Sequence, residues 1–541
     1  MKKECTYTAK VVRTPLTRAH LANVEKRLGQ FETALQRLFP TGDVEYIVRS
    51  LVHDSSEDGT VLSADLLPFS MPVDNPPLAQ GFPNPTLDPS GVPSLGLPWG
   101  NIPGADTGHY AVFIDAYFAS YHPVYPFIHE ASFRAEAQSQ PSTAHGLEWH
   151  ILWNAVLATG AWCHSDVQPG IDHEFYNQAV ELLQGVSLLD LGSRMLLQSL
   201  LLLHDFAQRS GMQEKSLQYL TIAAHMAMNL GYHRDFPDDT LSLLEKECRR
   251  RVWWTLYIFD SCVAKSFGLP LLLPESSFIK TQAVLNIPDE VIASHTSASP
   301  ELLQLIIQKS LNPETTVPPT EVDGPTLYTG LIAQARFHQM ANSIYRILLA
   351  YPSVPLHEVC RLETQINVWR DTCPSYLHDP SLSTKSPFLR FAGDRLRICD
   401  KNLRILLWRP YLMAWTTDGG NDEHRVAALR CVETARESMQ LVLGCMQNRS
   451  YPRVAASFLL YCLFHVSLIY CVFLRSSASY PYRASLLQDI QTMQDTLLHS
   501  WPSNDAQACH FLRVINRLCT FESPSSASPQ DNNTLPSLES V

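Results

Sequence analysis

Apolar residues recur at helical spacing through most of the chain, and no alternating run predicts a strand. No internal repeat is evident. The pattern predicts an all-α fold built around one large multi-helix domain. Helices are expected at 111–121, 148–163, 172–184, 193–209, 214–230, 241–266, 326–350, 357–372, 388–414, 422–447 and 453–475, with two more between 481 and 518. The Pro- and Thr-bearing stretch 286–325 is expected to be an exposed loop crossing.

A short helix near the N-terminus has the spacing of a coiled coil. Its apolar residues are separated by alternating steps of three and four, which is the a/d seam of paired helices. Thr17 can cap this helix and Pro40 ends it. Fewer than three heptads are marginal alone, so an amphipathic helix packed on its own domain is the alternative to dimerisation. The spacing and position favour a dimerisation seam made of Leu21, Val24, Leu28, Phe31, Leu35 and Leu38.

Composition divides the remaining chain into a linker, a helical domain and a tail. Pro, Gly, Ser and Asp dominate residues 55–109, and Ser, Pro and Asn dominate the C-terminus, so neither segment is expected to fold alone. The expected organisation is a basic segment at 1–15, the coil at 16–40, a flexible, disordered Pro-rich linker at 41–109, the helical domain at 110–520 and a disordered tail at 521–541.

The overall composition is that of a folded, acidic protein. Of 541 residues, 45% are hydrophobic and 17% charged, and the net charge is −12. Surfaces that wrap DNA are usually basic, so the bulk of this chain is not expected to contact DNA. The 13 cysteines are scattered with no C-x-x-C pair, and no signal peptide is expected, which indicates reduced, mostly buried thiols in an intracellular protein.

One segment is apolar enough to cross a membrane. Residues 454–474 carry no acidic or basic side chain and lie between Arg453 and Arg475. The alternative is a core helix, which is favoured by the polar residues within the segment and by the lack of a second span. We therefore expect a core helix and no membrane association.

The stretch 245–270, EKECRRRVWWTLYIFDSCVAKSFGLP, combines a charged first half with an apolar second half on one predicted helix. Glu247 and Arg251 lie four residues apart and can pair along one face. Asp260 follows the apolar run and needs hydrogen-bond donors if it is buried. The arginines 249–251 could serve nuclear import or DNA contact, but their place beside two tryptophans favours pairing with acidic groups of adjoining helices.

Three further motifs occur with this stretch. They are YFASYHPVYPFIHEASF at 117–133, YLTIAAHMAMNLGYHRD at 219–235 and NLRILLWRP at 402–410. In this order, the four resemble the middle homology region of fungal zinc-cluster (Zn2Cys6, Gal4-type) transcription factors of the xylanolytic-activator-like kind. The resemblance spans roughly residues 110–475 and implies an all-α regulatory domain.

The motif residues are expected to act as a scaffold. The prolines and histidines of the first motif should join two helices, and Arg409-Pro410 should close a helix with Arg409 bonded to carbonyls or to a carboxylate. The scaffold residues are His122, Pro123, Pro126, His129, Arg251, Trp253, Trp254, Asp260, Arg409 and Pro410.

The segment KECTY at 3–7 resembles the end of the family's zinc cluster. Cys5 would be the last of six thiolate ligands, and a two-zinc site needs all six. Zinc and DNA are therefore expected only if an upstream cluster is present, and neither is expected to bind this chain alone. Three explanations stay open: a start codon placed too far downstream, a cluster that has been lost, or an accidental match of KECTY.

Enzymatic chemistry is not expected. The densest polar group comprises Cys163, His164, Asp166 and His173, but neighbouring side chains diverge on a helix and the spacing suits no metal site. The chain has no nucleophile elbow, phosphate-binding loop or dinucleotide fingerprint.

The resemblance implies a nuclear regulator of RNA polymerase II transcription that forms homodimers or heterodimers through the coil and binds co-regulators. A small-molecule inducer is possible, in a pocket lined by aromatic residues of 253–259. The alternative is a partner protein or corepressor that does not bind DNA and pairs with a full-length relative.

Overall fold

The computed structural model describes helices in two successive groups. It describes residues 107–138, 146–164, 169–187, 192–235, 241–298, 307, 324–351, 354–374, 377, 387–418, 422–447, 452–475, 482–500 and 506–519. All of them belong to one compact unit. Within these ranges no β-strand occurs, and the only extended pairing is an isolated bridge between Arg234 and Lys280. The all-α prediction is confirmed.

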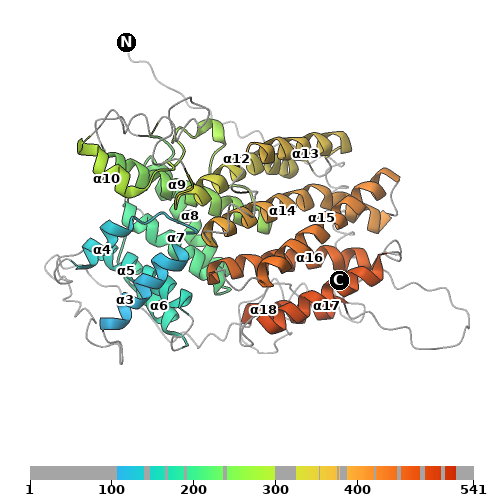
Figure 1. The fold of residues 1–541 in the computed structure, drawn as a ribbon, viewed down its shortest axis with the longest axis horizontal. Coiled ribbons are helices and arrows are strands. Elements are labelled where there is room, and N and C mark those ends of the chain that lie inside the picture. The colour runs from blue at the N-terminus through green and yellow to red at the C-terminus, as the bar shows by residue number, and fades with distance from the viewer. Residues whose placement is uncertain are drawn as a thin grey trace, which may run out of the picture. The chain divides into compact units, whose positions relative to one another are not determined.

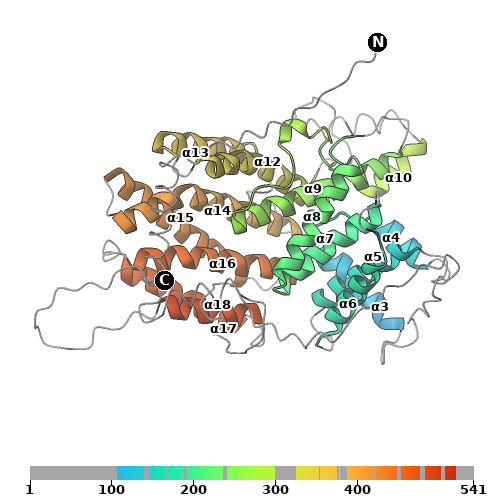
Figure 2. The same cartoon turned by 180° about the vertical axis from the view of Figure 1, so that it is seen from behind.

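The first group of helices surrounds one hydrophobic core (Figures 1 and 2). It consists of α3 (Thr107–Ala116) with a π-helical turn (Tyr117–Tyr121), α4 (Glu130–Gln138), α5 (Leu147–Cys163), α6 (Ile171–Gln184), α7 (Arg194–Arg209), α8 (Gln213–Asn229) and α9 (Leu243–Phe267). The helix α10 (Asp289–Ala298) follows and packs on α9.

The second group surrounds a second core. It consists of α12 (Thr329–Ala350), α13 (Leu356–Asp371), α14 (Pro387–Asp418), α15 (Asp422–Gln447), α16 (Arg453–Leu474), α17 (Arg483–Ser500) and α18 (Ala506–Cys519). The long helix α12 contacts both α9 and α14, so it joins the two cores. In Figures 1 and 2, α12 lies with α13 along the upper edge of the fold, above α14.

Local sequence explains where the central helix begins and ends. Ser242 and Glu245 form a capping box at the start of α9, which satisfies backbone amides that have no helical partner. Gly268 ends the helix with φ 66°, a conformation that is costly for residues with a side chain. The contact between α3 and α5 also requires a glycine, because a Cβ at Gly160 would lie 2.0 Å from the carbonyl oxygen of Phe113.

The apolar helix α16 lies in the second core. Among the described residues it is the one helix long and apolar enough to cross a membrane, but 61% of its most apolar window is buried within the fold. Its neighbours are α14, α15, α17 and α18. This environment is that of a core helix, as the sequence predicted.

Two helices lie where none was predicted from the sequence. The prediction of an exposed loop over 286–325 is wrong at its start, because α10 forms there and Leu285, Ile287 and Ile292 are buried together. Proline and threonine in the stretch obscured a helix that begins directly after Pro288. The short helix α4 was also missed. The basic segment, coil, linker to residue 106 and tail lie outside the described residues.

Candidate functional site

The charged half of α9 is held by acidic residues from loops and a neighbouring helix. Arg250 is buried and bonds to Asp235 at 2.7 Å and to Glu247 at 2.7 Å. Glu247 also accepts a hydrogen bond from the backbone amide of Leu285. The prediction that Glu247 pairs with Arg251 is therefore wrong. Glu247 pairs with Arg250, which lies three residues further along the same helix. Burial raises the pKa of Glu247 above its ordinary value despite the adjacent arginine.

Arg251 instead belongs to a cluster centred on Asp289, which we call the Asp289 cluster: His129, Arg251, Asp289 and Tyr328. Arg251 donates to both carboxylate oxygens of Asp289, at 2.7 and 3.3 Å, and lies 3.7 Å from the ring centre of Tyr328. The Tyr328 hydroxyl donates to Asp289 at 2.6 Å. His129 lies 3.4 Å from the same carboxylate. The cluster thus joins the first motif to α9, α10 and the start of α12.

The electrostatics of the cluster favour an ionised Asp289. Burial alone would raise the pKa of its carboxyl, but the hydrogen bonds from Arg251 and Tyr328 and the charge of Arg251 outweigh it and lower the pKa. Asp289 was not predicted from the sequence, because the residue was assigned to a loop. An acidic residue directly after a proline, at the start of a helix, was the available signal.

The first motif forms a tight junction between the π-helical turn and α4. His122 is 3% exposed, Pro126 is buried and Pro123 is half-buried. The ring of His122 packs edge-on against Phe118, with 5.1 Å between ring centres. Burial and the nearby charge of Arg251 lower the pKa of His122 to about 3, so this histidine is neutral at physiological pH.

The remaining residues of the α9 motif lie in the first core. Trp253 is fully buried, and Trp254 donates from Nε1 to the carbonyl of Gln282 at 2.8 Å. Asp260 is buried and accepts hydrogen bonds from the backbone amides of Leu272 and Leu273, both at 3.0 Å. These amides supply the donors that a buried carboxylate needs, and burial still raises its pKa.

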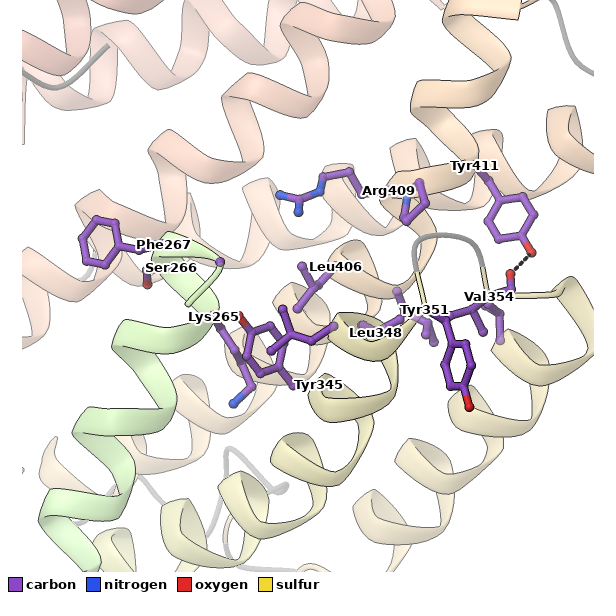
Figure 3. Close-up of a pocket in the computed structure, with 15 residues that line it drawn as sticks. Lys265, Ser266, Phe267, Tyr345, Leu348, Tyr351, Val354, Leu406, Arg409 and Tyr411 are labelled. Atoms are coloured by element: carbon purple, nitrogen blue, oxygen red, sulfur yellow. Dashed lines mark hydrogen bonds between the residues drawn. The ribbon is translucent and has the colours of Figure 1, made fainter. Parts of the chain in front are cut away.

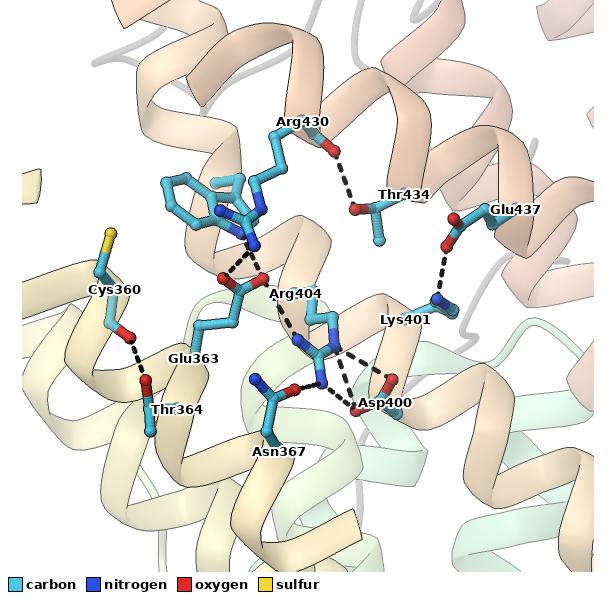
Figure 4. Close-up of polar contacts among 11 residues, drawn as sticks. Cys360, Glu363, Thr364, Asn367, Asp400, Lys401, Arg404, Arg430, Thr434 and Glu437 are labelled. Atoms are coloured by element: carbon cyan, nitrogen blue, oxygen red, sulfur yellow. Dashed lines mark hydrogen bonds and ion pairs between the residues drawn. The ribbon is translucent and has the colours of Figure 1, made fainter. Parts of the chain in front are cut away.

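A second charge network joins α13, α14 and α15 around Glu363 (Figure 4). Arg404 donates to Glu363 at 3.2 Å and to both oxygens of Asp400. Trp408 donates from Nε1 to the same Glu363 oxygen at 3.2 Å, and Arg430 pairs with the other oxygen at 2.7 Å. Glu363 was not predicted from the sequence, although its helical spacing with Val359, Leu362 and Ile366 places it on the buried face of α13.

The roles expected of Arg409 and Pro410 are wrong. Pro410 lies inside α14, which continues to Asp418. A proline removes only one backbone hydrogen bond, and packing on both sides keeps the helix intact. Arg409 is exposed and makes no hydrogen bond or ion pair with another described residue. The buried arginine of this motif is Arg404, on a different side of the helix.

A pocket lies near Arg409, away from the aromatic residues of 253–259 that were expected to line one. It has a volume of about 390 Å³ and is bounded by the end of α9, the end of α12, the start of α13 and the middle of α14 (Figure 3). The aromatic residues at 253–259 are instead packed in the first core.

Of the polar residues considered for catalysis, the structure describes Cys163, His164 and His173. Burial raises the pKa of the Cys163 thiol to about 12, which removes its nucleophilic form at neutral pH. His173 pairs with Asp172 at 3.1 Å, and Asp166 lies outside the described residues. No cluster of three metal-ligating side chains occurs in the part of the chain that the structure describes. Cys5 and the seam residues fall outside that part.

Two family descriptions match the chain. Residues 114–317 match the fungal specific transcription factor domain, and residues 17–55 match the Gal4-like dimerisation domain. The first match covers α4 to α10 and therefore contains the Asp289 carboxylate and its partners from α9 and the first motif. No solved structure matches the chain.

Curated relatives are transcription regulators by name. The lactose regulatory protein LAC9 of Kluyveromyces lactis is 34% identical over 200 residues, which is 37% of this chain and 22% of the relative. Activator of stress genes 1 of Saccharomyces cerevisiae and the transcriptional activator protein acu-15 of Neurospora crassa are each 24% identical over 241 residues, 44% of this chain and 23% of each relative. The chain spans less than a quarter of the length of these relatives.

The helical fold, the ordered motifs and the two family matches agree with one another. Residues 114–317 carry the fungal specific transcription factor domain, and the chain is similar in that region to transcription regulators of the fungal zinc-cluster type.

Proposed function

We propose that this protein regulates transcription by RNA polymerase II in the nucleus, its helical domain controlling the output of a DNA-binding dimer. The observation that carries the proposal is the match of residues 114–317 to the fungal specific transcription factor domain. The structure supports it through the Asp289 cluster, in which His129 of the first motif and Arg251 of α9 contact the same carboxylate. In this proposal, zinc and DNA contacts require a complete six-cysteine cluster, of which Cys5 would supply one ligand.

A reporter experiment tests the regulatory activity. The whole chain is fused behind a heterologous DNA-binding domain and tethered upstream of a reporter gene in a fungal host. Transcription should rise or fall severalfold relative to the DNA-binding domain alone, because a regulatory domain acts on the transcription machinery wherever it is tethered. Reporter output equal to that control in every growth condition would refute the proposal, and the direction of change separates activator from repressor.

Dimerisation is proposed to occur through the N-terminal seam, as the match of residues 17–55 supports. Replacing Leu28 and Leu35 together with aspartate should convert the dimer to single chains, because each charge would be buried in the seam. Light scattering on the whole chain measures the change. A variant with Gln30 and Gln36 replaced by aspartate adds equal charge outside the seam and should remain dimeric. An unchanged mass in the seam variant would contradict the assignment.

A second function is favoured by the acidity of the chain. With a net charge of −12, these residues are poorly suited to DNA themselves and better suited to acting through another protein. In this alternative the protein pairs with a full-length relative and acts as an inhibitor or corepressor. Sequencing the 5′ ends of the transcripts separates the alternatives: in-frame C-x-x-C pairs upstream of KECTY favour direct DNA binding, and messages starting at Met1 favour the partner protein.

A further inference from the structure

The pocket beside α14 is bounded by both hydrophobic cores (Figure 3). One wall of the pocket is the end of α9, residues 265–268. This helix belongs to the first core and contacts α12. The opposite walls come from α12, α13 and α14 of the second core. Its volume of about 390 Å³ lies within the range of small-molecule sites in proteins. A molecule bound there would contact both cores at once.

The pocket wall combines apolar and polar surface in similar amounts. Leu348, Val359, Leu406 and Leu407 contribute aliphatic surface. Two tyrosines in the wall have hydroxyls that are already used by the fold. The Tyr345 hydroxyl donates to the carbonyl of Ala264 at 2.7 Å and is also 2.9 Å from that of Leu269. The Tyr411 hydroxyl donates to the carbonyl of Val354 at 2.7 Å, which Figure 3 marks. These rings shape the pocket, and their hydroxyls are not free for a ligand.

Two cationic residues line the pocket, and only one of them is available. The ammonium of Lys265 lies 2.5 Å from Oδ1 of Asn342 and also donates to Ser261, on the side of Tyr345 away from Arg409 (Figure 3). Arg409 extends over the pocket near Leu406 and has no hydrogen-bond or ion-pair partner among the described residues. Its guanidinium can therefore accept an anionic partner without breaking a hydrogen bond or ion pair to the described residues.

Arg409 differs from two other arginines of α14, which have hydrogen-bond partners within the fold. Arg395 donates to the Tyr125 hydroxyl at 2.8 Å, and Arg404 binds Glu363 and Asp400. Both of these arginines are bonded to other side chains. Arg409 has no hydrogen-bond or ion-pair partner among the described residues. An exposed arginine needs no partner by itself, but this one lines a pocket that also offers aliphatic surface.

The geometry points to a binding site for a small molecule that carries a single carboxylate, which pairs with Arg409 while an aliphatic or aromatic part of the molecule lies against the leucine side chains between α9, α12 and α14. A guanidinium binds a planar carboxylate through two parallel hydrogen bonds. The inference deepens the proposed function, on which its regulatory meaning rests.

Binding is tested by isothermal titration calorimetry on the whole chain with octanoate and 4-phenylbutyrate, each compared with its neutral amide. At least one acid should bind about tenfold more tightly than its amide, the difference expected for one charge-assisted pair at a partly exposed site. Arg409→Gln should bring acid and amide to within about twofold of each other. Arg361→Gln, an exposed arginine of α13, should leave the preference for the acid intact.

A second variant distinguishes the contribution of the pocket space to binding from that of the Arg409 charge. Leu348→Trp adds bulk inside the pocket and should weaken acid and amide alike. The proposal is overturned if neither acid binds at millimolar concentration, if acid and amide bind equally to the wild-type chain, or if Arg409→Gln keeps the preference. Because this readout does not involve transcription, absent binding with an active reporter refutes the site alone, and binding with a silent reporter refutes the regulatory function alone.

Discussion

Replacing Arg251 with methionine is expected to lower the free energy of unfolding by about 3–5 kcal/mol, since removing one partner of a buried ion pair leaves the other uncompensated. Arg251 is 2% exposed and its partner Asp289 is 20% exposed. The change also removes the stacking of the guanidinium on Tyr328. Urea denaturation of the whole chain, followed by circular dichroism, measures the loss.

A double-mutant cycle shows whether the loss arises from the pair. Arg251→Met combined with Asp289→Asn should cost less than the sum of the single changes, by about 1–3 kcal/mol, because the two residues share one interaction. Arg361→Met is the matched control: Arg361 pairs with Glu358 on the surface and should leave the unfolding curve unchanged. Additive single costs would show that the cluster does not act as a unit.

Acidification is expected to destabilise the fold in the range where free histidines gain a proton. The pKa of His122 is about 3 in the folded chain and near 6.5 in the unfolded chain, so the unfolded state binds the proton first. The stability that neutral His122 provides is complete above about pH 6.5 and is lost as the pH falls towards 3. Between pH 7.5 and pH 5, His122 alone should cost about 2 kcal/mol.

Other histidines and Asp289 also contribute to the dependence of stability on pH, some in the same direction as His122 and one in the opposite direction. His204 and His338 are fully buried and have lowered pKa values for the same reason, so they add to the acid loss. Arg251, Asp289 and His129 face His122, and the lowered pKa of Asp289 extends the loss to lower pH. His173 acts in the opposite direction, because its hydrogen bond with Asp172 raises its pKa.

Urea denaturation at pH 7.5, 6 and 5 tests the assignment. Replacing His122 with phenylalanine keeps a ring against Phe118 and removes one group that takes up a proton on unfolding. The free energy of unfolding should then fall less steeply with decreasing pH, by up to roughly 1.4 kcal/mol per pH unit. Replacing His173 with glutamine should make the loss steeper. A His122→Phe variant with the pH dependence of the wild type would exclude His122 as a source.

Helix positions were largely predictable from local pattern, and the exceptions have physical causes. The α5, α6, α7, α8 and α15 helices begin and end within about one residue of the predicted bounds, because an apolar stripe with a period of 3.6 is local information. In contrast, α10 was hidden by the prolines and threonines around it. Its formation depends on Leu285, Ile287 and Ile292 packing against α9, which no window of sequence reveals.

For the scaffold residues too, local sequence predicted the kind of interaction, while packing decided the partner. The sequence indicated that the arginines of α9 would pair with acidic groups, but Arg251 finds Asp289, 38 positions away, in place of Glu247 on its own helix. In α14, Arg404 and Arg409 are five residues apart, which is roughly 140° around the helix axis, so they cannot face the same neighbour. Arg409 was selected from the motif, although packing against α13 and α15 buries Arg404.

The sequence alone determined the all-α fold, most helix bounds and the likeness to fungal transcription regulators, because each depends on spacing or motifs within short stretches of chain. Only the tertiary structure decided which carboxylate each arginine meets, that α14 passes through Pro410, and that the pocket lies beside Arg409 and away from the aromatic run of α9. These features depend on which helix faces come together. That choice is made by packing between residues far apart in the chain, and local periodicity carries no information about it.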